Sequence, residues 1–315
     1  METDKEVNPS IGKVAWLFPG QGSQQVGMGL ALCRESAAAR ALFDKADAVL
    51  GRPLSAICWQ GPEDLLRQTI NTQPAIMTFS LACLAAAREA GELDAPPDYV
   101  AGHSLGEYTA AVAGEALALE DGLLLVQERG RLMQAAGEQN PGAMAAILGL
   151  EEAAVRDLCL ATGSQVSNIT APGQVVIGGS VAAIAGAMEA ARSAGARRVV
   201  PLNVSGAFHT NLMDPAAAGM AAALSGAKMQ DPRVPLVANG TATALRDVSA
   251  LREELAFQLT HTVLWQKSVE YMLAEGVSSF VEFGPGQVLA GLIKRMAPSA
   301  TIRSIGEGTL LKQPV

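Results

Sequence analysis

Short apolar runs alternate with longer segments of helical periodicity over most of the chain. KVAWLFPGQGSQ (13–24) has an apolar strand that breaks into a glycine-rich loop, and apolar residues at helical spacing follow in 27–50 and 72–91. APPDYVAGHS (95–104) is a turn followed by a brief, buried strand pattern. Because strands alternate with helices, these patterns predict an α/β domain with a mostly parallel sheet.

The pattern changes at about residue 143. Residues 142–204 predict, in order, a strand, a helix, a hairpin, a second helix and a final strand. This β-α-β-β-α-β order is the signature of a ferredoxin-like unit. Alternating strands and helices resume afterwards. We therefore expect a large α/β domain formed by residues 1–140 and 207–315, interrupted by a ferredoxin-like α+β subdomain at 141–206.

Composition narrows the functional classes. The 315 residues include 31 Asp plus Glu against 23 Lys plus Arg, which argues against nucleic acid as the main partner. No uncharged apolar run is long enough to span a bilayer, and the acidic start METDKEVNPS is unlike a secretory signal. We therefore expect a cytoplasmic protein. The cysteines lie far apart and predict reduced core residues instead of a metal or redox site: Cys33, Cys58, Cys83 and Cys159.

The segment GHSLGEY (102–108) holds the first candidate for chemistry. Gly102 to Gly106 fits the G-x-S-x-G pattern of a nucleophile elbow, with a strand before it and a helix after it. The two glycines allow a strained turn that exposes the Ser104 hydroxyl at the helix N-terminus, where the Leu105 N–H can stabilise an oxyanion. The alternative is an ordinary serine helix cap beside packing glycines. The surrounding strand and helix favour the nucleophile.

A serine nucleophile needs a base, and the chain has three histidines. His103 adjoins Ser104 on the strand side and cannot easily curl round to its hydroxyl. His209 follows the inserted unit in NVSGAFHTNLM, whereas His261 lies in a loop between predicted helices. The usual α/β-hydrolase order of serine, acid and histidine favours His261, but the pattern alone leaves both open.

Two further positions suggest substrate contacts. Gln21 follows the first strand, at the sheet edge where ligands commonly bind, so its backbone N–H is a candidate second oxyanion donor; a ligand-free glycine turn is the alternative. Arg129 is the charged residue on an otherwise apolar stripe of the helix predicted over 119–138. A buried arginine needs an anion. That anion is either an internal carboxylate or a substrate carboxylate held by two parallel hydrogen bonds.

A series of motifs occurs in order along nearly the whole chain: FPGQGSQ, TQPA, GHSLGEY, VQERGRLMQ, GAFH, WQKSVEYM and VEFGPGQVLAGLIKR. Together they resemble the malonyl-CoA:acyl-carrier-protein transacylases, including free-standing acyltransferases that serve some polyketide synthases. Any one motif is weak, but the ordered set is specific. The resemblance implies a hydrolase-like α/β domain carrying a ferredoxin-like subdomain, in agreement with the elements predicted above.

The resemblance also implies a catalytic pair. It makes Ser104 the acylated nucleophile and His209 the base, against the hydrolase order, with the backbone carbonyl of Gln258 orienting the imidazole. The chain departs from the family pattern beside Gln258. His261 stands where Asn or Ser is frequent, and Thr262 where Pro is usual, so the resemblance specifies the geometry of this loop less well than the other assignments.

The remaining roles concern the substrate. The resemblance implies that the backbone amides of Gln21 and Leu105 form the oxyanion hole, and that Arg129 grips the malonyl carboxylate. Gln73 of the TQPA motif is implied as a further substrate-binding residue. Phe208, directly before the base, is expected to disfavour an additional methyl group beside the acyl α-carbon, and so to select malonyl over methylmalonyl.

The implied reaction is a ping-pong transfer of a malonyl group from CoA, through an acyl-serine, to the phosphopantetheine thiol of an acyl carrier protein, for fatty-acid or polyketide synthesis. Malonyl-CoA is a substrate, so no cofactor is expected, and neither nucleic acid nor a membrane is an expected partner. A serine thioesterase or proofreading acyl hydrolase is the alternative, although Arg129 argues for a carboxylated acyl group. An inactive docking module is a third hypothesis, which the filled reactive positions oppose.

Overall fold

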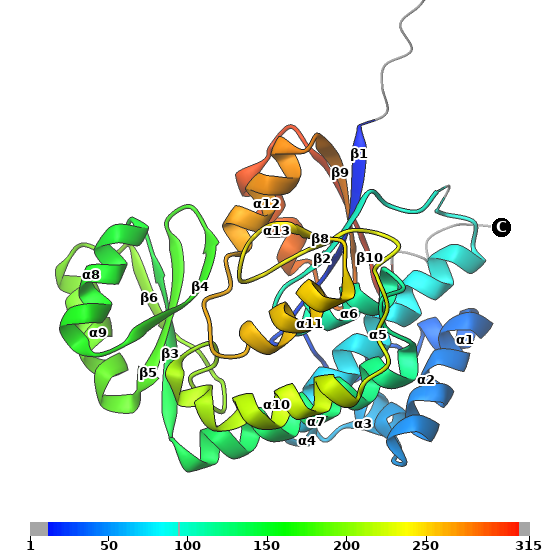
Figure 1. The fold of residues 1–315 in the computed structure, drawn as a ribbon, viewed down its shortest axis with the longest axis horizontal. Helices are drawn as coiled ribbons and strands as arrows, with labels where there is room; N and C mark the ends of the chain where they lie inside the picture. The colour runs from blue at the N-terminus through cyan, green and yellow to red at the C-terminus, as the bar shows by residue number, and fades with distance from the viewer. Residues whose placement is uncertain (1–11, 94, 309–315) are drawn as a thin grey trace, which may run out of the picture.

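A computed structural model describes residues 12–93 and 95–308, and the acidic N-terminal stretch discussed above lies outside them. These residues form a six-stranded sheet in the order β10-β9-β1-β2-β7-β8 and a four-stranded sheet in the order β4-β5-β3-β6 (Figure 1). The strands are β1 (Lys13–Phe18), β2 (Tyr99–Gly102), β3 (Gly142–Leu148), β4 (Gln165–Ala171), β5 (Gln174–Ser180), β6 (Arg198–Pro201), β7 (Leu236–Val237), β8 (Ala244–Leu245), β9 (Val277–Phe283) and β10 (Thr301–Ile305).

The six-stranded sheet is mostly parallel. β10, β9, β1, β2 and β7 pair in parallel, and β8 adds an antiparallel edge. The α-helices are α1 (Leu32–Glu35), α2 (Ala37–Leu50), α3 (Leu54–Gln60), α4 (Glu63–Arg67), α5 (Thr69–Glu89), α6 (Leu105–Ala113), α7 (Leu119–Gln139), α8 (Glu152–Thr162), α9 (Val181–Ser193), α10 (Asp214–Gly226), α11 (Val248–Phe257), α12 (Trp265–Ala274) and α13 (Val288–Met296). The predicted α/β class with a mostly parallel sheet is confirmed.

Helices cover both faces of this sheet. Along β1, Trp16 and Phe18 belong to the hydrophobic cluster that includes α2, α5, α6 and α7, whereas Ala15 and Leu17 belong to the cluster formed with α12 and α13. Successive side chains of a strand point to opposite faces, so one apolar run supplies both clusters. In Figure 1, α12 and α13 lie on one side of β1 and β9, and α5 lies on the other.

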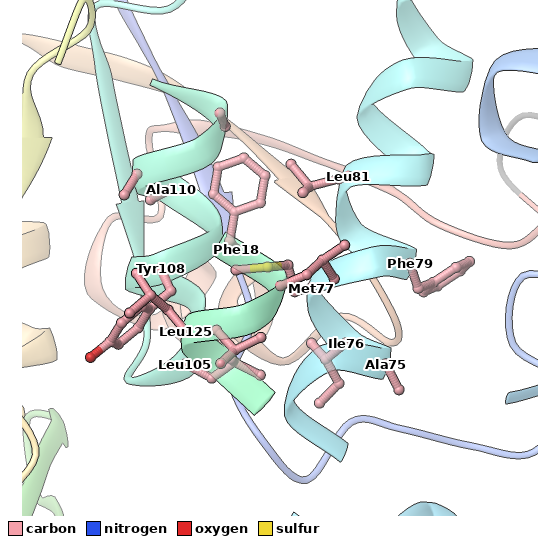
Figure 2. Packing of buried hydrophobic residues seen from close by; sticks show 14 of the residues in the cluster. Phe18, Ala75, Ile76, Met77, Phe79, Leu81, Leu105, Tyr108, Ala110 and Leu125 are labelled. Carbon is pink, nitrogen blue, oxygen red and sulfur yellow. The ribbon is translucent and has the colours of Figure 1, made fainter. Parts of the chain in front are cut away.

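The 21-residue helix α5 forms the centre of the larger cluster. By length and composition it could cross a membrane, yet 89% of its most apolar stretch is buried inside the protein. It packs against α7 and α6. Figure 2 shows Phe18 and Leu81 in the space between α5 and α6. The helix is therefore a core element, and its packing fixes the position of α6, which begins directly after Ser104.

The four-stranded sheet stands at one side of the molecule with α8 and α9 (Figure 1). Its elements follow the order β3-α8-β4-β5-α9-β6 with antiparallel pairing, and its side chains form a separate hydrophobic cluster. The predicted element order is thus confirmed, while the boundaries at 141 and 206 stay a prediction. Two hydrogen bonds join β4 to the loop between α11 and α12. Ile169 N–H donates to Val263 O, and Val263 N–H donates to Ser167 O.

One helix prediction needs correction. The single helix expected over 27–50 is two helices, because Ser36 leaves helical geometry and its Oγ accepts a hydrogen bond from Ala39 N–H as the cap of α2. The residues before Leu32 form turns instead of helix. The cysteines named above are free and buried, so their predicted place in the core is confirmed.

Candidate active site

Ser104 sits on a sharp turn between β2 and α6. Its backbone has φ 53° and ψ −104°, a left-handed conformation that is costly for a residue with a side chain. The neighbouring glycines make the turn possible. A Cβ at Gly102 would collide with the backbone of Gly106, and a Cβ at Gly106 would collide with the carbonyl of Phe18. The turn is the strained strand-to-helix geometry that the G-x-S-x-G pattern predicts.

The Ser104 hydroxyl contacts two functional groups. Its Oγ lies 2.7 Å from His209 Nε2, and Arg129 Nη2 donates to it over 3.0 Å. The Oγ makes no hydrogen bond that caps α6, so the geometry does not favour the alternative that Ser104 is an ordinary helix cap. The hydroxyl is instead held between a base and a cation.

His209 is oriented by a backbone carbonyl. Its Nδ1 lies 2.6 Å from Gln258 O. A carbonyl can only accept, so Nδ1 carries the proton and Nε2 presents its lone pair to Ser104. Burial, reinforced by the positive charge of Arg129, lowers the pKa of His209 to about 3, which keeps the imidazole neutral at physiological pH.

The other two histidines do not contact the Ser104 hydroxyl. His103 lies beside the turn, where its ring packs edge-on against Trp265, and desolvation lowers its pKa to about 4. His261 is exposed, stacks on Phe257 and hydrogen-bonds the Phe257 carbonyl through Nδ1. The geometry therefore favours His209 over His261 as the base.

Arg129 is 1% exposed and takes part in none of the ion pairs among the described residues. Its Nη1 donates to Gln73 Oε1 over 2.9 Å, and Nη2 donates to Gln258 Oε1 over 2.8 Å. The guanidinium also lies 5.4 Å from the centre of the Tyr108 ring. Its Nε has no partner within residues 12–93 and 95–308. The internal salt bridge is absent there, and neutral oxygens hold the cation instead.

A polar network behind the nucleophile includes residues that the sequence interpretation missed. The side chain of Gln258 donates from Nε2 to Ser104 O and to Glu107 Oε2, each over 2.9 Å. Asn239 accepts from Ser104 N–H at Oδ1 over 2.7 Å and donates its own N–H to Glu107 Oε1 over 2.8 Å. Glu107 is fully buried, and this burial raises the pKa of its carboxyl well above the usual value. An acidic residue in an apolar helix, one turn after the serine, is the signal that could have identified it.

A cavity of about 310 Å³ opens between the two sheets at this point. The predicted residues that line it are Gln21, Ser104, Leu105, Arg129, Phe208 and His209. The backbone N–H groups of Gln21 and Leu105 have no hydrogen-bond partner in the described part of the chain, so both are available as donors. Met144, Asn168 and Val176 of the four-stranded sheet line the opposite side.

Two predicted residues lie behind the cavity wall. Gln73 and Gln258 are buried and reach the site through Arg129. The loop where the chain departs from the family pattern is anchored by Thr262, whose Oγ1 donates to Val166 O over 2.7 Å. No group of three or more metal-ligating side chains occurs within residues 12–93 and 95–308.

Comparisons with known proteins identify similar chains and similar folds. A family described as acyl transferase domain matches residues 15–307. The malonyl CoA-acyl carrier protein transacylase of Bacillus subtilis strain 168 is 42% identical over 291 residues, which are 91% of this chain and 91% of the relative. A solved acyl-carrier-protein S-malonyltransferase from Burkholderia pseudomallei 1710b is 40% identical with a TM-score of 0.91, covering 95% of this chain and 98% of that one. A malonyl-transacylase in complex with a type II PKS acyl-carrier protein is 37% identical with a TM-score of 0.91, covering 95% and 97%.

Proposed function

The chain belongs to the acyl transferase domain family, and from this premise we propose that it transfers a malonyl group from malonyl-CoA to the phosphopantetheine thiol of an acyl carrier protein. One observation carries the proposal. The Ser104 hydroxyl contacts both the His209 imidazole and the Arg129 guanidinium, which has no carboxylate partner among the described residues. A nucleophile beside a neutral base and an uncompensated buried cation suits an acyl group that carries its own carboxylate.

The first half-reaction acylates Ser104. His209 Nε2 takes the hydroxyl proton as Oγ attacks the thioester carbonyl carbon, and the carbonyl oxygen gains negative charge. The backbone N–H groups of Gln21 and Leu105, which line the cavity, donate to this oxyanion. Collapse of the tetrahedral intermediate breaks the carbon–sulfur bond. The imidazolium then gives its proton to the departing CoA thiolate.

The second half-reaction runs the same steps backwards. The pantetheine thiol of the carrier enters the cavity, loses its proton to His209 and attacks the acyl-serine carbonyl. The proton returns to Ser104 as the ester bond breaks. The cavity of about 310 Å³, enclosed between the segments that follow β1 and β2 and the four-stranded sheet, limits the access of water to the acyl-serine between the two steps.

Phe208 gives a basis for choosing between malonyl homologues. Its side chain is 6% exposed and lines the cavity beside His209. An additional methyl group in this close-packed space is disfavoured by about ten- to two-hundred-fold. Phe208→Ser enlarges the space, so it should narrow the preference for malonyl-CoA over methylmalonyl-CoA. Competition between the two esters, read from the mass of the acylated protein, measures this, and an unchanged product ratio would show that Phe208 does not select.

The setting of the reaction is part of the proposal. The thioester itself supplies an activated acyl group, so the reaction needs no cofactor. Four buried, free cysteines suit a reducing compartment, and we place the enzyme in the cytoplasm with malonyl-CoA and an acyl carrier protein as its partners, and with neither nucleic acid nor membrane.

Incubation with labelled malonyl-CoA in the absence of a carrier protein tests the proposal. The wild type should form a stable acyl-enzyme with one label per chain. Ser104→Ala should form none while keeping its fold, because the change removes one oxygen atom. Steady release of CoA without an adduct would indicate a hydrolase, and a lack of both label and CoA release would indicate an inactive module.

A further inference from the structure

The segment Ser104-Leu105-Gly106-Glu107 matches the sequence of a helix capping box, in which the serine side chain and the glutamate side chain cap each other's backbone N–H. Neither half of that box forms. Ser104 N–H donates to Asn239 Oδ1, and the Glu107 carboxyl accepts from Gln258 Nε2 and from Asn239 N–H. A fully buried carboxyl thus lies one helical turn after the nucleophile, with no role in the reaction steps described above.

The amide of Gln258 lies between Glu107 and Arg129. Its Oε1 accepts from Arg129 Nη2, and its Nε2 donates to Glu107 Oε2 and to Ser104 O. A guanidinium can only donate and a carbonyl oxygen can only accept, while both oxygens of the Glu107 carboxyl accept from N–H donors. All three neighbours therefore require the same orientation of the amide, with oxygen towards Arg129.

We propose that Glu107 is a positioning residue that fixes the orientation of the Gln258 amide and, through it, aims the Arg129 guanidinium at the carboxylate of the acyl group. This inference rests on the proposed malonyl transfer. The Gln258 amide separates Glu107 from Arg129, so the two side chains form no direct ion pair. The guanidinium is therefore held in place while its positive charge stays available for the carboxylate of the acyl group. The Nε of Arg129 is buried and has no hydrogen-bond partner in the described part of the chain.

The two oxygens of Glu107 act on different parts of the site. Oε2 is linked by the Gln258 amide to Arg129, and the position of Arg129 affects only an acyl group with a carboxylate. Oε1 is linked by Asn239 to Ser104 N–H, and so to the nucleophile elbow that every acyl group uses. A defect in the elbow lowers malonyl and acetyl transfer alike, whereas a defect in the aim of Arg129 lowers malonyl transfer selectively. The ratio of the two rates therefore separates a positioning role from a merely structural one.

Glu107→Gln keeps the shape of the side chain and removes its ability to accept at both oxygens. The new NH₂ group must face either the NH₂ of Gln258 or the N–H of Asn239, and both are donors. Rotation of Gln258 relieves the first clash only by turning its NH₂ towards Arg129. We expect the ratio of malonyl to acetyl acylation to fall by about ten- to a hundredfold, the range for one hydrogen bond to a charged group.

Glu254→Gln is the matched control. Glu254 is also a buried glutamate, at 4% exposed, and its carboxyl accepts from Gly240 N–H. Gln258 N–H donates to the backbone carbonyl of Glu254, which the substitution keeps, and no hydrogen bond joins the Glu254 carboxyl to Gln258 or Arg129. Substitution of Glu254 removes a buried carboxyl and leaves the amide of Gln258 in place. We expect its ratio of malonyl to acetyl acylation to equal that of the wild type.

The experiment is a single-turnover acylation in an equimolar mixture of malonyl-CoA and acetyl-CoA, with the adducts on Ser104 quantified by intact mass. A Glu107→Gln ratio equal to that of the wild type would overturn the inference. Absence of a malonyl adduct on the wild type would instead overturn the proposed function, so the two failures are distinguishable.

A second variant keeps the inference testable if Glu107→Gln does not fold. Gln258→Leu retains the backbone carbonyl that orients His209 and removes the amide, so its ratio should fall as for Glu107→Gln. An unchanged ratio in Gln258→Leu would equally contradict the proposal. Where both variants fold, Glu107→Gln should cause no additional fall in the Gln258→Leu background, because Glu107 acts through the amide. An additional fall would show that it acts by another route.

Discussion

At the residue scale, the site places a cation and a base on the same hydroxyl. Arg129 donates to Ser104 Oγ, and its positive charge adds to the effect of burial in lowering the pKa of His209. The guanidinium therefore holds the serine, helps to keep the imidazole neutral and forms no ion pair with a carboxylate in the described part of the chain. None of these effects needs an acidic member of a triad, since Gln258 O orients the imidazole instead.

Arg129→Ala should lower malonyl transfer selectively. Loss of a hydrogen bond between charged groups costs about 1.5–3 kcal/mol, so malonyl transfer should fall by about ten- to a hundredfold relative to acetyl transfer. The comparison of kcat/KM for the two CoA esters measures this difference. Equal losses for both esters would mean that Arg129 only maintains the structure of the site.

The low pKa of His209 predicts an unusual pH dependence. Burial and the charge of Arg129 disfavour the imidazolium, so the base stays unprotonated from pH 7 down to pH 5 and becomes protonated only as the pH approaches about 3. The kcat/KM of acylation reports this free-enzyme group and should stay nearly level between pH 7 and 5. Exposed His261 serves as the control, because His261→Ala should leave the profile unchanged. A profile with half of the rate lost near pH 6.5 would contradict the assignment.

The sequence allowed several of these residues to be predicted, and the reasons differ. Ser104 was identified from its glycine spacing and Arg129 from its position on an apolar stripe, because both signals are local. His209 lies 105 residues from Ser104, and only the family resemblance favoured it over His261. Hydrogen bonds between residues that are distant in the sequence determine the roles of Glu107, Asn239 and the Gln258 side chain. The spacing of residue types along the chain does not reveal which buried donors and acceptors pair in this way.

At the element scale, the elbow depends on how closely α6 packs on the first sheet. Gly106 lies in the first turn of α6 against the carbonyl of Phe18 in β1, and any Cβ there must displace backbone. A helix after Ser104 was predicted from the G-x-S-x-G pattern and its context, but this close approach was not. The break at Ser36 was missed for a similar reason: the apolar spacing continues through it, and only the capping hydrogen bond to Ala39 N–H separates α1 from α2.

Gly106→Ala should destabilise the protein and disturb the elbow. Forcing an additional methyl group into a packed site costs about 1–3 kcal/mol of unfolding free energy, measured by urea denaturation. Gly291→Ala in α13 is the matched control, because a Cβ at Gly291 meets open space and alanine stabilises a helix by up to about 1 kcal/mol relative to glycine. A Gly106→Ala variant as stable as the wild type would contradict the packing argument.

At the scale of the whole molecule, the site is assembled from distant parts of the chain. Ser104 and Arg129 precede the four-stranded sheet in sequence, while His209 and Gln258 follow it. The cavity is lined by the segments that follow β1 and β2 on one side and by the four-stranded sheet on the other. The α/β class and the order of the inserted elements could be predicted, because hydrophobic periodicity depends on residues that are close together in the sequence. The sequence did not predict the direct hydrogen bonds between β4 and Val263, which join the small sheet to the loop after Gln258.

The central claim is that Ser104 carries the malonyl group from one thiol to another. Acyl-enzyme formed with labelled malonyl-CoA, freed of CoA and then mixed with a phosphopantetheinylated acyl carrier protein, tests it most directly. We expect the label to leave Ser104 and to be recovered on the carrier thiol in an equal amount. Recovery of the label as free malonate, or its retention on the enzyme in the presence of the carrier, would show that Ser104 does not pass the malonyl group to the carrier.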